Sequence, residues 1–177
     1  MDVEPISGQL FRDALSRFAS GVTIVAARTA NGLVGFTATG FTSVSLEPPL
    51  ILVCVGRRAS AHDGIVDADR FGVSVLATDQ AWIAEQCARS CVDRFRGVAL
   101  SRDRVPQIDG AIAQLACLRH ARHEAGDHTI LVGEVLSGVI GSGRPLVHFA
   151  RRFGGFTTEL VGRPIPDIVP IQRGESP

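Results

Sequence analysis

The chain has 177 residues with 18 basic and 18 acidic side chains, so its formal net charge is zero. This length suits one domain, and the balanced charge argues against a protein of nucleic acids or membrane surfaces, which usually carries a basic excess. All of the basic residues are arginines and tyrosine is absent, so catalysis by a lysine amine, a lysine Schiff base or a tyrosyl acid is excluded.

The amino-terminal part of the chain predicts one helix and one β-hairpin. Ser7 can cap a helix whose apolar residues form a single stripe, and Gly21 stands where a glycine often ends a helix. A β-branched run at 22–27 and a second run at 33–39 flank an Asn-Gly pair at 31–32. Asn-Gly between two such runs is the strongest short-range signal for a hairpin.

Short strands and two further helices are predicted in the remainder of the chain. Ser60 can cap a helix that runs to Ala68, and Thr78 or Asp79 can cap one that carries Trp82. Strands are predicted at 43–46, 50–55, 71–76, 111–122, 129–137 and 146–149. Because consecutive strands mostly lack a helix between them, this order predicts an antiparallel sheet closed into a barrel, with helices outside it.

The run at 50–55 contains only apolar residues, which is typical of a strand buried on both faces. It is also the longest apolar stretch, and it is far too short to cross a bilayer. The amino terminus shows no signal pattern, and the four cysteines lack the spacing of a metal or redox motif. We therefore predict a cytoplasmic protein, with one domain at 1–160 and a proline-rich tail at 161–177.

The first candidate site is the segment 35–45. It places five hydroxyl side chains and two glycines between two predicted strands. Hydroxyls and backbone amides in such a loop can bind a phosphate or the polar edge of a flat ring without any net charge. The alternative is an ordinary strand connection whose hydroxyls hydrogen-bond within the loop.

The second candidate is His128, which follows a Gly-Asp pair at the point where a turn becomes a strand. It is either a catalytic residue at the barrel mouth or a hydrogen-bonded structural residue. His120 and His123 are expected to point to opposite faces of a strand, and no pair of carboxylates completes a site, so no metal centre is predicted. With so little acid–base machinery, a reaction here would depend on a cofactor.

Several segments together resemble the flavin reductase-like family, whose fold is an FMN-binding split barrel. Their order and spacing agree over about residues 7–155; they lie at 11–15, 18–25, 35–50, 71–76, 111–117, 125–130 and 132–135. The resemblance implies a mainly β chain with flanking helices around a split antiparallel barrel. It also implies a homodimer that reduces FMN or FAD with NADH or NADPH. Within the family the chain looks most like short reductase components that supply reduced flavin to a separate monooxygenase.

The resemblance also assigns roles to individual residues. His128 is expected near the nicotinamide, as a catalytic residue that orients it or supplies a proton. The flavin ring and ribityl chain are expected against Thr37, Ala38, Thr39, Gly40, Phe41, Ser43, Val44, Ser45, Cys54, Val55 and Gly56. The phosphate is expected near Arg57, Arg58, Ser60 and Arg94. Phe95 and Asp127 stand at positions that match the family's site residues. Arg152 and Phe153 match a basic-aromatic pair of the family and are expected to close the site. The chain departs from the family at Thr39-Gly40, where many members have two Ser, and at Ser74, where an Asn is common.

Two other functions stay open beside the reductase. One is an enzyme that keeps its flavin and acts directly on an organic substrate, in an oxygenase or other redox step. The other is a flavin-binding carrier without fast turnover. The sequence does not decide between FMN and FAD, or between NADH and NADPH.

Overall fold

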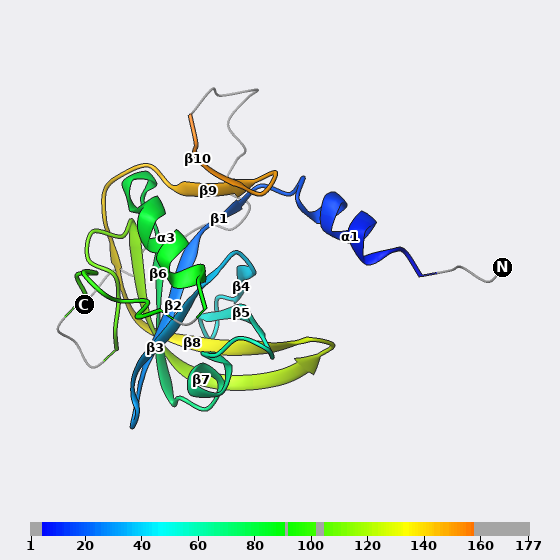
Figure 1. The fold of residues 1–177 in the computed structure, drawn as a ribbon. Coiled ribbons are helices and arrows are strands. Elements are labelled where there is room, and N and C mark those ends of the chain that lie inside the picture. Colours follow the sequence, from blue (N-terminus) through cyan, green and yellow to red (C-terminus); the bar gives the residue numbers. More distant parts are fainter. Residues whose placement is uncertain (1–4, 91, 102–104, 158–177) are drawn as a thin grey trace.

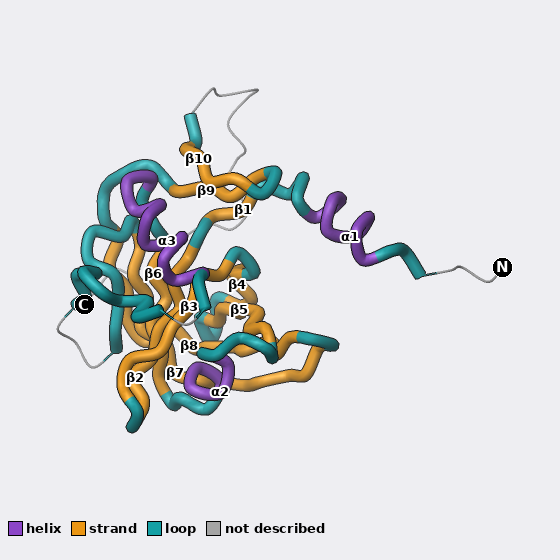
Figure 2. Tube along the Cα trace, in the orientation of Figure 1, coloured by secondary structure: helices purple, strands orange, loops and turns teal. Residues whose placement is uncertain are grey.

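The computed structural model describes residues 5–90, 92–101 and 105–157, and Figures 1 and 2 show its elements. The helical elements are α1 (Gly8–Leu15), α2 (His62–Val66), the 3₁₀ turn η1 (Thr78–Gln80) and α3 (Ala81–Ala88). The strands are β1 (Ser20–Gly21), β2 (Thr23–Thr29), β3 (Gly32–Ala38), β4 (Phe41–Ser45), β5 (Leu50–Gly56), β6 (Arg70–Val75), β7 (Ala113–Ala125), β8 (His128–Ile140), β9 (Leu146–Phe149) and β10 (Arg152–Gly155). The predicted tail at 161–177 lies outside the described residues.

Seven strands form the main sheet, in the order β3-β2-β6-β7-β8-β5-β4, and every neighbouring pair is antiparallel. The mainly β split barrel predicted from the resemblance is confirmed. The closed barrel predicted from the strand order is wrong, because no ladder joins the outer strands β3 and β4 within the described residues. These two strands follow one another in the chain, so the opening in the sheet lies at the segment 39–40 that connects them.

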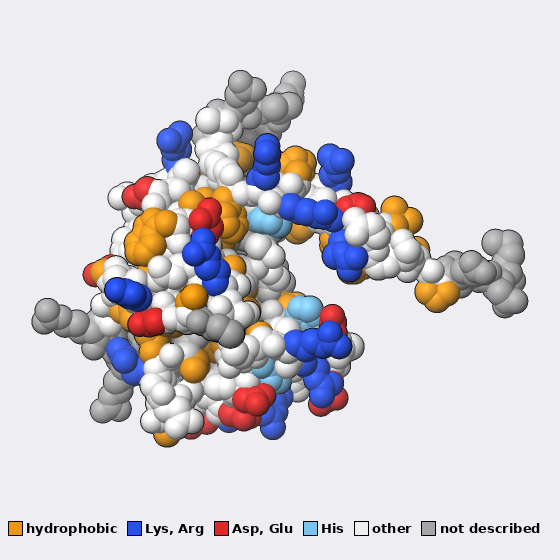
Figure 3. All heavy atoms as spheres, viewed as in Figure 1, with side chains coloured by type: hydrophobic (Ala, Val, Ile, Leu, Met, Phe, Trp, Pro, Cys, Tyr) orange, Lys and Arg blue, Asp and Glu red, His pale blue; other side chains and the backbone are white. Residues whose placement is uncertain are grey.

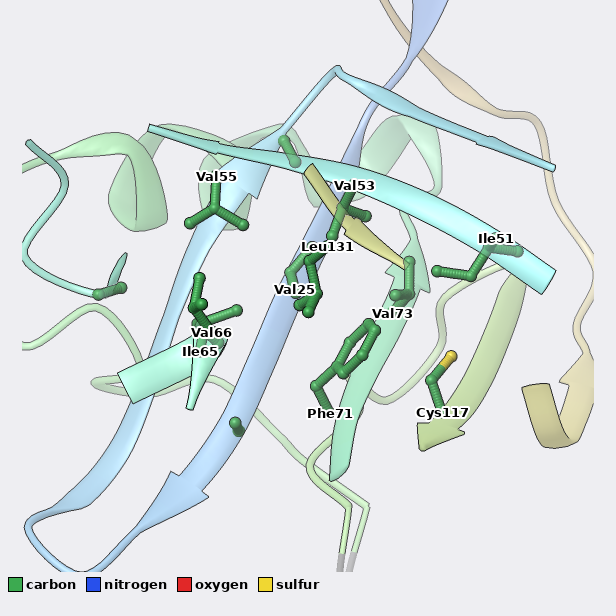
Figure 4. Close-up of a cluster of buried hydrophobic side chains, with 13 residues drawn as sticks. Val25, Ile51, Val53, Val55, Ile65, Val66, Phe71, Val73, Cys117 and Leu131 are labelled. Atoms are coloured by element: carbon green, nitrogen blue, oxygen red, sulfur yellow. The ribbon is translucent and has the colours of Figure 1, made fainter. Parts of the chain in front are cut away.

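The core lies between the faces of this rolled sheet, and Figure 4 shows one of its clusters. Phe71 of β6, Leu131 of β8 and Val53 of β5 are fully buried in it. Along β5 the burial alternates, so that Leu52 and Cys54 are only half-buried on the other face. The prediction that this strand is buried on both faces is therefore wrong. Its outer face is apolar for another reason, because it forms the wall of a cleft.

A small second sheet has the order β1-β9-β10. Of its strands only β9 was predicted, as the strand at 146–149. Gly21 belongs to β1 and pairs with Val147, so it does not end the first helix. That helix ends earlier, at its C-cap Ser16. The strands β1 and β10 are only two and four residues long, too short for a periodic pattern to be visible.

Helix α1 begins where the sequence predicts, since the Ser7 hydroxyl accepts a hydrogen bond from the Leu10 amide at 3.2 Å. Its apolar stripe, however, is not buried against any other part of the described residues. No residue of the helix is buried, and Figure 1 shows it extending away from the sheets. Two contacts hold its end: the Ala150 amide donates to the Ser16 carbonyl at 2.8 Å, and Arg151 pairs with Asp13 at 2.5 Å.

The predicted caps of the other two helices are wrong. Helix α2 begins at His62, its N-cap Ala61 supplies no side-chain hydrogen bond, and the Ser60 hydroxyl instead accepts from Arg94. The Thr78 hydroxyl donates to the Arg144 carbonyl at 2.9 Å. In both places a partner distant in sequence takes the hydroxyl that would otherwise cap the helix. None of the helices in the described residues is long and apolar enough to span a membrane.

Candidate functional site

A cleft of about 540 Å³ lies between the end of α1 and the outer face of β4 and β5. Its walls are mostly apolar, with Arg12 on the side of α1 and with His148 and Arg151 on the side of the second sheet. It is lined by Phe11, Arg12, Leu15, Ser16, Phe18, Ser20, Thr39, Gly40, Phe41, Thr42, Leu52, Cys54, His148 and Arg151. A mostly apolar cavity of this size with a few polar groups is typical of a small-molecule site.

The wall formed by β5 leads from this cleft to His128. Leu52, Cys54 and Gly56 share one face of the strand, since alternate residues point the same way. Gly56 pairs with His128 at the start of β8. A Cβ atom at Gly56 would lie 3.6 Å from His128 Nε2, so the imidazole lies over this glycine. Two residues of a strand span about 7 Å, which places His128 at the end of the cleft wall.

Asp127 orients the His128 ring. Its carboxylate oxygen lies 2.8 Å from His128 Nδ1, which leaves Nε2 on the side of Gly56. The hydrogen bond and the charge of His128 lower the pKa of the Asp127 carboxyl below its usual range. The structure therefore shows His128 as both hydrogen-bonded and half-exposed.

The segment 37–41 divides its residues between the core and the cleft. The Thr37 hydroxyl donates to the Ala84 carbonyl of α3 at 2.6 Å, and the Ala38 side chain is buried in the core. Thr39, Gly40 and Phe41 line the cleft. Farther along β4, Ser43 and Val44 are exposed and Ser45 is half-buried, and none of the three lines the cleft.

Gly40 is placed where a side chain would narrow the cleft floor. A Cβ atom there would lie 3.1 Å from Cys54 Cβ and 3.5 Å from its sulfur. Cys54 lines the cleft, whereas Val55 points into the core. The other two described cysteines are buried, and burial raises the pKa of the Cys87 thiol to about 11 and that of Cys117 to about 12. Both thiols therefore remain protonated at neutral pH.

Arg94 lies at a second, smaller pocket of about 200 Å³, which Ser60 and Phe95 also line. Its guanidinium donates to the Gly35 carbonyl and to the Ser60 hydroxyl at 3.0 Å each, and to the Arg89 carbonyl at 2.9 Å. Phe95 packs on Gly35, where a Cβ atom would lie 2.5 Å from the ring. Arg94 thus joins three segments of the fold, and within residues 5–90, 92–101 and 105–157 two of its five N–H donors have no partner.

The remaining predicted residues lie apart from the main cleft. Arg57 lies in a third pocket, 3.7 Å from Glu124, and Arg58 is exposed beside the Asp127 turn. Phe153 of β10 makes an edge contact with His148, with ring centroids 5.7 Å apart, and Arg152 is exposed. In the described residues no group of three His, Cys, Asp or Glu side chains is arranged to hold a metal ion.

Sequence reasoning missed one whole wall of the cleft. Arg12 and Phe18 come from the α1 region, and His148 and Arg151 from the β9–β10 hairpin. These segments are far apart in the chain, and no motif links them. Thr42 and Leu52 were also missed, although Thr42 lies between two predicted residues and Leu52 lies two positions before the predicted Cys54. Strand alternation from Cys54 back to Leu52 would have found the latter.

A profile of the family described as "Flavin reductase like domain" matches residues 15–157 of this chain. The chain belongs to this family. The FMN reductase (NADH) SmoA of Agrobacterium fabrum is 39% identical over 151 residues, covering 84% of this chain and 86% of its own length. The reductase component of 4-hydroxyphenylacetate 3-monooxygenase from Thermus thermophilus is 43% identical over 146 residues, covering 82% and 94%.

A solved structure also agrees with the assignment of this chain to the flavin reductase-like family. The NADH:FAD oxidoreductase SgcE6 of Streptomyces globisporus C-1027, in complex with NAD and FAD fragments, superposes with a TM-score of 0.82 at 34% identity. The match covers 90% of this chain and all of the other. The apolar cleft fits the flat ring of a flavin, because Gly40 keeps its floor open and Phe41 and Leu52 offer apolar faces.

Proposed function

We propose that this chain is an NAD(P)H-dependent flavin reductase, which transfers a hydride to FMN or FAD and releases the reduced flavin to a separate monooxygenase. The observation that carries the proposal is the continuous wall from Thr39–Phe41 through Cys54 to His128, in a chain of the flavin reductase-like family. Relatives named as an FMN reductase and as a monooxygenase reductase component support it.

The residues of the chain have limited but definite tasks in this reaction. A bound flavin supplies the ring that accepts the hydride. Phe41 and Leu52 exclude water from the cleft, and Gly40 leaves its floor open. Asp127 fixes the His128 ring at Nδ1, so that a protonated imidazole donates from Nε2. Positioning two ring systems in contact accounts for most of the catalysis that such a site can provide.

The site is completed by a second copy of the chain in this proposal. Phe11, Leu15 and Phe18 line the cleft and are each more than half exposed, Phe18 at 71%. On β8, Val139 and Ile140 are also exposed, Ile140 at 92%. Exposed apolar patches of this kind usually mark a protein interface. A homodimer that covers α1 would enclose the flavin, and its mass in sedimentation velocity tests this. The cytoplasmic location stays a prediction.

The reductase is tested by mixing the protein anaerobically with FMN, FAD or riboflavin and with NADH or NADPH in a stopped-flow instrument. We expect flavin absorbance to bleach, and reduced flavin to pass a filter that retains the protein. Bleaching with all of the flavin retained would favour an enzyme that acts directly on an organic substrate. Tight flavin binding without bleaching would favour a carrier, and either result would overturn the proposal.

A further inference from the structure

A pocket of about 320 Å³ lies at the end of the barrel, between α2 and the end of the β7–β8 hairpin. We call it the barrel-end pocket; it is lined by Arg57, His62, Val66, Arg122, His123, Glu124 and Thr129. Figure 3 shows arginine, histidine and acidic side chains gathered on this part of the surface. The family resemblance assigned only Arg57 of these residues to a ligand, and the hydride-transfer site does not use the pocket.

The pocket has two guanidinium groups whose partners are exposed carboxylates. The Arg57 guanidinium lies 3.7 Å from Glu124 at its Nη1, beyond hydrogen-bond distance, and this side chain donates no hydrogen bond within the described part of the chain. Arg122 Nη1 donates to Asp67 at 2.6 Å, and both of these side chains are more than half exposed. Exposed ion pairs of this kind add little stability, so an anion with better geometry can replace the carboxylates.

One wall of the pocket is fixed by His62. His62 Nδ1 lies 2.7 Å from Asp63, and its Nε2 lies 2.9 Å from the Thr129 hydroxyl. Thr129 is buried, so the ring joins α2 to the start of β8. Both ring nitrogens of His62 are occupied, so the side chains that can turn to an anion here are Arg57, His123 and, once it leaves Asp67, Arg122.

The position of the pocket relates it to the proposed hydride-transfer site. Thr129 follows His128 directly in β8, and their side chains point to opposite faces. The backbone amide of Arg57 donates to the Asp127 carbonyl at 2.9 Å, which fixes Arg57 beside the His128 turn. The pocket begins one residue from His128 but on the opposite face of β8, so a dinucleotide with its ring at His128 would have to pass around the hairpin end to place its phosphates there.

We propose that the barrel-end pocket binds phosphate groups of a dinucleotide through Arg57 and Arg122. Guanidinium groups bind phosphate oxygens with paired, charge-assisted hydrogen bonds. The phosphates belong either to the nicotinamide dinucleotide or to FAD. This assignment rests on the proposed function for its biological ligand, whereas the binding of a diphosphate is testable without turnover.

The first test is calorimetric titration of the whole chain with ADP, a probe that carries a diphosphate. We expect Arg122→Gln and Arg57→Gln each to weaken ADP binding about 10-fold or more, the usual effect of losing one charge-assisted hydrogen bond. The matched control is Arg119→Gln, on the same strand and paired with Asp69 away from the pocket. ADP that does not bind, or that binds Arg122→Gln and Arg119→Gln equally well, overturns the assignment.

Steady-state assays then identify the source of the phosphates. A raised KM for NADH with unchanged kcat in Arg122→Gln assigns the pocket to the nicotinamide dinucleotide. A raised Kd for FAD, with that for FMN unchanged, assigns it to FAD. If the wild type binds ADP as expected but never oxidises NADH, the pocket stands and the reductase fails. If the wild type reduces flavin but ADP does not bind in the pocket, the reductase stands and the phosphate site is refuted.

Discussion

Replacing Arg94 with methionine is expected to lower both the stability of the fold and the affinity for FMN. The guanidinium donates three hydrogen bonds, to the Gly35 and Arg89 carbonyls and to the Ser60 hydroxyl. A hydrogen bond from a charged group contributes about 1.5–3 kcal/mol when its partner is left unsatisfied. Arg94 is only half-buried, so water replaces part of each bond, and we expect about 2–3 kcal/mol in total.

For a chain of this length, each kcal/mol corresponds to about 2–4 °C in Tm. The expected fall is therefore about 5–10 °C, measured by thermal unfolding of the flavin-free protein. Arg96→Met is the control, because Arg96 is exposed and its side chain donates no hydrogen bond within the described segments. A Tm within about 1 °C of the wild type would show that Arg94 does not join these segments as argued.

The same variant separates the structural role of Arg94 from its predicted phosphate contact. If the two remaining N–H groups meet the phosphate, the Kd for FMN rises about 10-fold and the Kd for riboflavin, which has no phosphate, changes much less. Equal losses for the two flavins would refute the phosphate contact. Equilibrium titration by flavin fluorescence measures both constants on one preparation.

Three further predictions follow from the geometry. His128→Ala should slow flavin reduction about 100-fold in stopped flow with flavin Kd nearly unchanged; unchanged turnover would leave His128 a structural residue. Gly72→Ala should cost about 3 kcal/mol or more in urea unfolding, because its Cβ would lie 2.1 Å from the Pro106 carbonyl oxygen; near-wild-type stability would contradict this. The pKa of the Asp127 carboxyl is lowered in the folded state, so its ionised form stabilises the fold above the unfolded-state pKa, and this stabilisation is lost as the pH falls through the folded-state pKa. The Tm of Asp127→Asn should therefore fall less than that of the wild type between about pH 5 and 3. Parallel plots of Tm against pH for the two proteins would argue against this role.

Most of the main sheet was predictable because its signals are local. The β2–β3 hairpin follows from two β-branched runs around Asn31-Gly32, and Gly32 adopts the positive φ of 113° that such a turn demands. The strands β5 and β6 were found within a residue of their bounds for the same reason. The second sheet was not predictable, because β1 and β10 become strands only by pairing with β9.

Only the part of the candidate site that is formed by local sequence motifs could be predicted. The loop that ends at Phe41 and the turn at His128 follow from local composition and from the family resemblance. Their orientation does not: strand alternation turns Ala38 and Val55 into the core, although both were predicted to contact flavin. The uniform apolar run of β5 hid this alternation, because its outer face must also be apolar where it forms the cleft wall.

Helix α1 shows why a pattern alone does not reveal what a surface contacts. The stripe of Leu10, Phe11 and Leu15 is typical of a helix packed on its own core, yet all three side chains are more than half exposed. The Arg151–Asp13 pair and the Ala150 amide hold the end of the helix beside the cleft. An apolar stripe held at the rim of an apolar cleft gains stability only when something covers both. In the homodimer proposed above, a second copy of the chain would cover both at once, so we expect flavin affinity and dimerisation to change together when this surface is altered.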